Sequence, residues 1–143
     1  MTEIVGEAGP RGHMPDGALD MALSQEILIV EDEFLIAQGL CMQIEDMGLS
    51  VCGTAASADE AVALAEEFRP ALVLMDMRLQ GDKDGVDAAM AIHRKVGSQV
   101  IFITGSREPA TMARIQLDHP AAVLFKPISD AQLSLAIQTA LSL

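Results

Sequence analysis

The chain has 143 residues, enough for one domain of ordinary size and too few for two. Hydrophobic residues make up 50% of it, but there are only 4 Phe and no Tyr or Trp, so we expect a single aliphatic core. The net charge of −12, with 9 Lys and Arg residues, argues against a nucleic-acid surface or an anionic membrane surface, because both attract clusters of basic side chains.

The first segment, residues 1–26, is rich in Gly, Pro and acidic residues and has no sustained hydrophobic periodicity, so we predict a flexible N-terminal arm. Residues 18–23 are alternatively compatible with a short amphipathic turn. The β-branched apolar run at residues 27–30 predicts a buried strand, which ends in the acidic residues Glu31 and Asp32.

A helix, a second strand and a second helix follow. Residues 34–47 carry apolar side chains at helical spacing, and Gly48 is placed to end this helix. Residues 49–54 form a short apolar run that predicts a strand. Ser57, with Glu60 three residues later, is the pattern of a capping box that opens the next helix.

The central strand is predicted at residues 71–76, where five apolar residues run directly into Asp76. A carboxylate at this point is either a functional group at the edge of a sheet or the cap of a helix, and the strand alone leaves both interpretations open. Residues 78–85 are dense in turn-forming residues, and residues 86–96 again have helical spacing.

Two further strand–helix units complete the pattern. Each predicted strand is short and apolar, and each helix has a recognisable start. The residues that mark these units are Thr104 after the strand at 99–103, Pro109 at the next helix, Lys126 and Pro127 after the strand at 121–125, and Ser129 with Gln132 as a capping box.

The alternation of strand and helix, five times over, predicts an α/β fold. Short connections and strands buried on both faces indicate a parallel sheet covered by helices on both sides. Five units fit the flavodoxin-like, doubly wound (βα)5 arrangement with strand order 2-1-3-4-5. This order places the first and third strands side by side, so we expect Glu31, Asp32 and Asp76 to share one crevice with Thr104 and Lys126.

Carboxylates that are crowded in one crevice repel each other, by about 4 kcal/mol for a pair about 4 Å apart at an effective dielectric near 20. A hard divalent cation with oxygen ligands offsets this repulsion, which predicts Mg²⁺. Lys126 adds a positive charge, Thr104 a hydroxyl donor, and Gly105 a close backbone N–H. These groups suit the attack of a carboxylate on a phosphoryl group.

Motifs at four strand ends resemble those of a known family, the CheY-like receiver domains of two-component response regulators. The resemblance covers residues 27–142, so we expect a receiver domain over residues 27–143. The motifs stand in the order expected of the family and are Glu31-Asp32, Asp76, Thr104-Gly105 and Lys126-Pro127.

The resemblance implies a role for each matched residue. It makes Asp76 the phosphoacceptor, which a histidine kinase or phosphotransferase phosphorylates. Magnesium would be held by Asp32 directly, by Glu31 through water, by Asp76, and by the backbone carbonyl of Arg78. The remaining implied roles are phosphoryl binding and switching by Thr104, Gly105 and Lys126, and a cis peptide bond before Pro127.

Three positions depart from the common receiver pattern. The loop after Asp76 lacks the usual proline and is one residue longer before Gly85, and Val123 stands where an aromatic switch residue is expected. The run from Phe102 to Ser106 partly resembles the "FAT GUY" receivers of alphaproteobacterial stress signalling, with Ile103 in place of alanine and Arg107 in place of tyrosine.

We expect a single-domain response regulator rather than an enzyme, with output through binding of a downstream protein. The main alternative is a phosphohydrolase with an aspartyl-phosphate intermediate, but such enzymes need a second acid where Arg78 stands. A receiver that binds partners without phosphorylation is a second alternative. A nucleotide-binding domain is disfavoured because the turn after the first strand is acidic and lacks glycine.

The two cysteines, Cys41 and Cys52, lie within apolar patterns and are expected to be buried thiols in a reducing compartment. The sequence has neither a secretory signal pattern nor an apolar run of about 18 residues. We therefore expect a cytoplasmic domain with no membrane contact.

Overall fold

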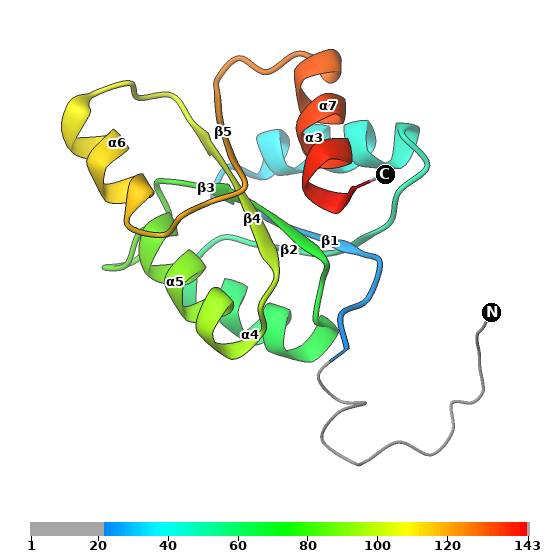
Figure 1. The fold of residues 1–143 in the computed structure, drawn as a ribbon, viewed down its shortest axis with the longest axis horizontal. Coiled ribbons are helices and arrows are strands. Elements are labelled where there is room, and N and C mark those ends of the chain that lie inside the picture. The colour runs from blue at the N-terminus through cyan, green and yellow to red at the C-terminus, as the bar shows by residue number, and fades with distance from the viewer. Residues whose placement is uncertain (1–21, 143) are drawn as a thin grey trace.

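A parallel sheet runs through the part of the chain that the computed structural model describes, residues 22–142 (Figure 1). The strands are β1 (Ile27–Val30), β2 (Val51–Ala55), β3 (Leu72–Asp76), β4 (Gln99–Thr104) and β5 (Ala122–Phe125). Their spatial order is β2-β1-β3-β4-β5 and all neighbours pair in parallel, which confirms the predicted flavodoxin-like topology.

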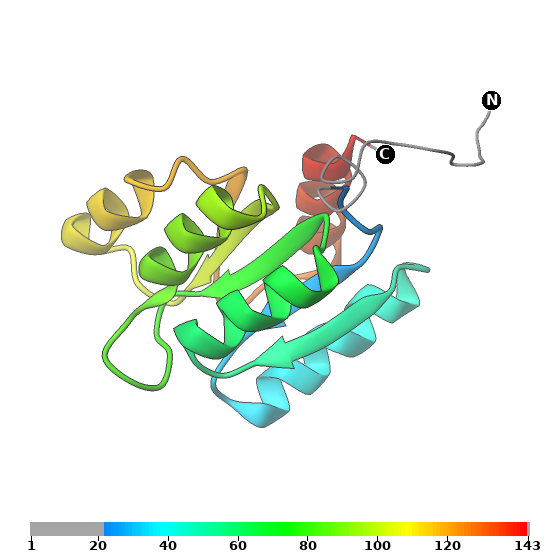
Figure 2. The ribbon, with the colours of Figure 1, turned by 90° about the horizontal axis from the view of Figure 1, so that it is seen from below.

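Helices follow each strand and cover both faces of the sheet (Figure 2). They are α3 (Phe34–Asp46), α4 (Ala58–Phe68), α5 (Gly85–Lys95), α6 (Pro109–Gln116) and α7 (Asp130–Leu141). Helices α3 and α7 pack on one face, while α4, α5 and α6 lie on the other. The predicted bounds agree with these within one or two residues at most ends.

Two apolar clusters, one on each face of the sheet, make up the core. Alternate residues of each central strand enter opposite clusters, since successive side chains of a strand point to opposite faces. In β1, Leu28 packs towards α4 and α5, whereas Ile27 and Ile29 pack towards α3 and α7. All of these side chains are buried, which explains why the strands read as unbroken apolar runs.

Helix caps agree with the sequence at α7 and differ from it at α4. Both reciprocal bonds of the capping box form between Ser129 and Gln132. At α4 the Ser57 hydroxyl accepts the Glu60 N–H at 3.2 Å, but the Glu60 carboxylate accepts the N–H of Ala56 at 2.8 Å instead of that of Ser57. The prediction of a complete capping box is therefore wrong in its second hydrogen bond. The Glu60 carboxylate bonds Ala56 instead, because Ala56 lies just past the end of β2, where its N–H needs an acceptor.

The end of the predicted N-terminal arm contacts the domain. The Ser24 N–H donates to the Arg69 carbonyl at 2.6 Å, and the Ala71 N–H donates to the Glu26 carbonyl at 3.0 Å. The predicted flexible segment and amphipathic turn otherwise fall in residues 1–21, which lie outside the described residues, as does residue 143. Among residues 22–142, no helix is long and apolar enough to span a membrane.

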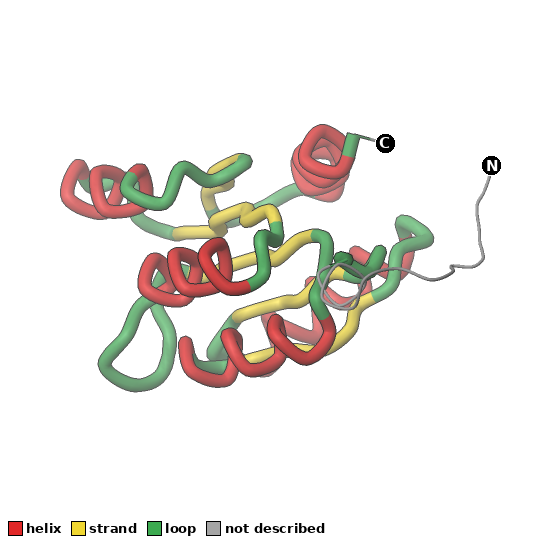
Figure 3. Tube along the Cα trace, turned by 60° about the horizontal axis from the view of Figure 1, so that its bottom comes forward, coloured by secondary structure: helices red, strands yellow, loops and turns green. Residues whose placement is uncertain are grey.

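The connection from β3 to α5 is a long loop that stands out from the helices around it (Figure 3). Its base is closed by a hydrogen bond from the Gly85 N–H to the Met77 carbonyl at 2.9 Å. Midway, the Gln80 N–H donates to the Ala56 carbonyl at 3.0 Å, which ties the loop to the start of α4. The longer loop anticipated from the sequence is thus anchored at both its base and its middle.

Candidate functional site

The polar residues at the strand ends meet at the carboxyl edge of the sheet. Glu31 and Asp32 follow β1, Asp76 ends β3, Thr104 ends β4 and Lys126 follows β5. Strands β1 and β3 are neighbours, which brings their terminal acids together as the predicted strand order requires. The apolar strands bury three of these side chains almost fully, since Glu31, Asp76 and Thr104 are 3%, 7% and 2% exposed.

Three carboxylates converge on one point. One oxygen each from Glu31, Asp32 and Asp76 lies within 4.8 Å of the others. The Lys126 ammonium Nζ lies 3.2 Å from Glu31 Oε1 and 3.5 Å from Asp76 Oδ1. A single lysine neutralises only one of the three carboxylates, so the cluster keeps an excess of negative charge when all three are ionised.

Burial governs the ionisation of these groups. It raises the pKa of Glu31 from 4.5 to about 7, against the opposing hydrogen bond from the Glu33 N–H at 3.1 Å. Burial likewise raises the pKa of Asp76, although Lys126 and the Met77 N–H favour its charged form. Burial acts to lower the pKa of Lys126, but the carboxylates of Asp76 and Glu31 outweigh it and raise that pKa.

The donor set fits a hard divalent cation. Its members are carboxylate oxygens that face one another, and pairs at 4.8 Å repel by about 3 kcal/mol at an effective dielectric near 20. Magnesium prefers one or two carboxylates, completed by waters and phosphate oxygens. Asp32 and Asp76 supply two carboxylates at the wall of an open cavity, and Glu31 adds a third within 4.8 Å of both.

Asp76 presents its two oxygens differently. Its Oδ1 accepts the Met77 N–H at 2.9 Å and faces Lys126, two contacts that Oδ2 does not share, while a side-chain hydrogen bond with Glu31 also favours the charged form of this carboxylate. Gly85, the first residue of α5, lies directly behind, so close that a methyl group there would overlap the Asp76 carbonyl oxygen. The backbone of Asp76 is thus held between the sheet and α5, while Met77 and Lys126 hold the Oδ1 side of its carboxylate.

A cavity of about 490 Å³ opens over the acids. Thr104 lies in its wall, and the Thr104 hydroxyl oxygen accepts the Ser106 N–H at 3.1 Å. Nothing in the described part of the chain accepts the Thr104 hydroxyl proton. The cavity is also lined by Asp32, Glu33, Asp76, Met77, Arg78, Gly105, Ser106, Glu108, Thr111 and Lys126.

The structure brings together every residue singled out from the sequence for this site. Glu31 is buried and does not line the cavity. The residues of the set that do line it are Asp32, Asp76, Arg78, Thr104, Gly105 and Lys126. The Lys126–Pro127 peptide bond is cis, as the resemblance implied. Val123, where an aromatic residue was expected, packs half-buried against the core, while the nearby Phe125 ring lies 3.8 Å from the guanidinium carbon of Arg107.

The contacts of two residues beside the site, Gly85 and Ser106, could not be predicted from the sequence. Gly85 reads there as part of a turn, and only its packing against Asp76 reveals that no larger residue fits. Ser106 connects the Thr104 oxygen to α6, since its own hydroxyl lies 3.3 Å from that of Thr111. A glycine at a helix start is a weak signal for the contact of Gly85 with Asp76. The resemblance to receiver domains places Ser106 beside the site but does not indicate its hydrogen bonds.

Comparison with known proteins points to one family. A family model described as response regulator receiver domain matches residues 27–138. Two relatives are the transcriptional regulatory protein PdtaR of Mycobacterium tuberculosis, 34% identical over 128 residues, and the phyllosphere-induced regulator PhyR of Methylorubrum extorquens, 38% identical over 140 residues. The matched regions cover 90% and 97% of this chain but only 62% and 49% of those proteins.

Solved structures agree with the sequence relatives. The receiver domain of a modulated diguanylate cyclase from Desulfovibrio desulfuricans has a TM-score of 0.78 at 35% identity, covering 82% of this chain and 93% of that one. The PhyR receiver domain of Erythrobacter litoralis has a TM-score of 0.74 at 31% identity, covering 84% and 92%.

Proposed function

The chain belongs to the response regulator receiver family, and from that premise we propose that Asp76 is its phosphoacceptor. The observation that carries the proposal is the arrangement at the sheet edge. The Asp76 carboxylate lines the same cavity as Asp32, Lys126 and Thr104, and Glu31 lies within 4.8 Å of both acids. A nucleophile, cation ligands and donors for a phosphoryl group therefore lie within reach of one another.

In the proposed reaction, Asp76 Oδ2 attacks the phosphorus of a phosphohistidine on a kinase or phosphotransferase. The new O–P bond forms as the P–N bond breaks, and the imidazole leaves as the neutral ring after taking up a proton. The hydrogen bond from Met77 and the charge of Lys126 hold Oδ1, which orients Oδ2 towards the cavity. Burial of Asp76 among apolar strands keeps bulk water from competing at its inner side.

The proposed roles of the neighbouring groups follow from their positions. Asp32 and Asp76, with Glu31 through water and the Arg78 carbonyl, would hold Mg²⁺, which supplies positive charge to the phosphoryl oxygens and relieves repulsion between the acids. Lys126 forms an ion pair with a second phosphoryl oxygen after transfer. The Thr104 hydroxyl donates its free proton to the third.

We propose protein partners on both sides of the signal. Upstream stands a histidine kinase or phosphotransferase, and downstream a protein whose affinity changes with the phosphorylation of Asp76. The chain spans only part of PdtaR and PhyR, so output without an attached domain, a cytoplasmic location and membership of the FAT GUY subgroup stay predictions.

Phosphorylation tests the proposal directly. Incubation with acetyl phosphate and Mg²⁺ should add the mass of one phosphoryl group to the wild type and none to Asp76→Asn. The matched control is Asp82→Asn, an exposed acid in the loop after β3, which should be phosphorylated like the wild type. Absence of added mass in the wild type, with no magnesium-dependent shifts of amide resonances near Asp76, would sink the phosphoacceptor role and favour partner binding without phosphorylation.

The aspartyl-phosphate phosphohydrolase is the alternative that the site supports less well. Such an enzyme needs a second acid two residues after the nucleophile to protonate the leaving group. Arg78 occupies that position and lines the cavity, so a cation stands where the general acid is required. Rapid turnover of acetyl phosphate, with no phosphorylated protein accumulating and with turnover abolished in Asp76→Asn, would restore this alternative.

A further inference from the structure

Helix α6 is attached to the domain by few apolar contacts. Ile115 is its only buried residue, whereas α5 buries five residues on the same face of the sheet. Met112 packs partly buried against the core, and Leu117 at the end of the helix is 60% exposed. Figure 1 shows α6 at the edge of the molecule, beside α5. The position of such a helix depends on its polar contacts.

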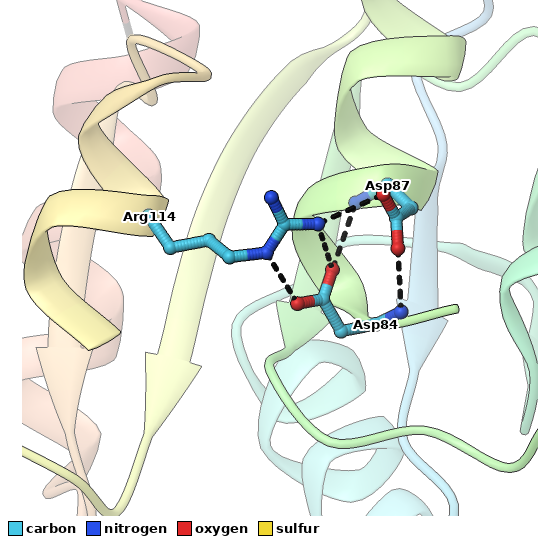
Figure 4. A network of polar contacts seen from close by, with 3 residues as sticks. All are labelled: Asp84, Asp87 and Arg114. Atoms are coloured by element: carbon cyan, nitrogen blue, oxygen red, sulfur yellow. Dashed lines mark hydrogen bonds and ion pairs between the residues drawn. The ribbon is translucent and has the colours of Figure 1, made fainter. Parts of the chain in front are cut away.

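A charged network centred on Arg114 joins α6 to the start of α5 (Figure 4), and His93 of α5 also pairs with Asp118, just after α6, at 2.8 Å. The Arg114 Nε donates to Asp84 Oδ2 at 2.7 Å and its Nη2 to Asp84 Oδ1 at 3.0 Å. The same Nη2 lies 2.8 Å from Asp87 Oδ1. Two parallel bonds from a guanidinium to a carboxylate fix direction as well as distance. We refer to Arg114, Asp84 and Asp87 as the α5–α6 clamp.

The α5 end of the clamp adjoins the phosphoacceptor. Asp84 and Asp87 form a reciprocal capping box, with bonds of 3.0 Å in each direction, which sets the first turn of α5. Gly85 follows Asp84 directly and packs against the Asp76 carbonyl, and its N–H is bonded to Met77. A displacement of Asp84 therefore shifts Gly85, and through it the backbone of Asp76 and Met77.

The other end of α6 is connected to the same site by hydrogen bonds. The Ser106 N–H donates to the Thr104 hydroxyl, and the Ser106 hydroxyl donates to that of Thr111 in the first turn of α6. The Glu108 N–H also donates to the Ser106 hydroxyl at 3.2 Å. Turning the Thr104 side chain towards a phosphoryl group removes the acceptor of Ser106, which releases the segment that leads into α6.

We propose that Arg114 is a positioning residue that holds α6 in its present place and so opposes the turn of Thr104 towards a phosphoryl group on Asp76. The inference rests on the proposed phosphoacceptor role and adds a residue to its regulation. Because Thr104, Ser106 and Thr111 tie α6 to the cavity, Thr104 reorients freely only when α6 moves, and the bonds of Arg114 to Asp84 and Asp87 oppose that movement. Any ligand that binds the reoriented state then binds more tightly once the clamp is broken.

Two variants break the clamp with opposite changes of charge. Arg114→Met removes a positive charge, while Asp84→Asn removes a negative one and keeps an oxygen that caps α5. Arg94→Met is the matched control, because this exposed arginine of α5 has no ion pair with any described residue. Opposite charge changes separate loss of the clamp from a general change of potential at the acidic cluster.

The test is titration of each full-length protein with beryllofluoride, a phosphoryl mimic, at saturating Mg²⁺, followed by amide spectra. We expect both clamp variants to bind beryllofluoride about fivefold more tightly or better than the wild type, and Arg94→Met to bind equally. Both clamp variants should also melt at a lower temperature than the wild type. A merely structural role would lower Tm without tightening binding.

Three outcomes overturn the coupling. Equal or weaker beryllofluoride binding by both clamp variants removes Arg114 from the regulation of the site, while leaving the phosphoacceptor role intact. Weaker binding by Arg114→Met with tighter binding by Asp84→Asn assigns the effect to charge alone, because beryllofluoride is an anion. If the wild type itself binds no beryllofluoride with Mg²⁺, the proposed function fails first and the coupling falls with it.

Discussion

Adding one methyl group at Gly85 tests whether α5 packs as closely against the end of β3 as the structure shows. In Gly85→Ala the added carbon would overlap the Asp76 carbonyl oxygen and lie 3.1 Å from its carbonyl carbon and from Met75 Cγ. Two of these three atoms belong to the backbone of β3, which cannot turn aside as a flexible side chain does. Either α5 or the end of β3 must therefore shift.

We expect this overpacking to lower the free energy of unfolding by about 1–3 kcal/mol. Gly39→Ala is the matched control, because Gly39 lies exposed within α3 and a methyl group there meets nothing within 4 Å. Alanine in a helix interior is more favourable than glycine by about 0.5–1 kcal/mol, so this control should be stabilised. Replacing glycine by alanine is thus expected to lower the free energy of unfolding at position 85 and to raise it at position 39.

Urea unfolding at constant pH, with thermal melts in parallel, measures both effects. A change of 1 kcal/mol corresponds to roughly 4 °C in Tm for a domain of this size. Gly85→Ala should also be phosphorylated more slowly by acetyl phosphate, since the shift falls on the backbone of Asp76. Equal unfolding free energies for Gly85→Ala and the wild type would refute the close contact between α5 and the end of β3.

Two further predictions concern the charges of the site. Because burial raises the pKa of Glu31 from 4.5 to about 7, its protonated form stabilises the fold fully below pH 4.5 and loses this effect as pH rises through about 7. The metal-free protein should therefore gain about 2 kcal/mol from this group between about pH 8 and about pH 5.5, and Glu31→Gln should lack that part of the response in thermal melts. Asp32→Asn should melt higher than the wild type without metal, because it relieves repulsion in the cluster, and should lose the increase in Tm on adding Mg²⁺. An unchanged magnesium response would remove Asp32 from the metal site.

The fold and most of the site could be predicted because their signals are local. Apolar runs, helical spacing and capping residues lie within a few positions of the elements that they specify, and the strand order follows from a rule for five alternating units. Acids at strand ends could be assigned to one crevice for the same reason. Parallel strands carry their last residues to one edge, whatever the details of packing.

Tertiary structure alone decided how α6 is held and how closely α5 approaches Asp76. Arg114 lies 30 residues from Asp84 in the sequence, and nothing local marks the two as partners until α6 is placed beside α5. Gly85 likewise shows its importance only against the carbonyl of Asp76. The sequence by itself determined which elements form and which acids meet, because these depend on neighbouring residues. The contacts between helices required the folded chain, since they depend on the relative positions of side chains that many residues separate.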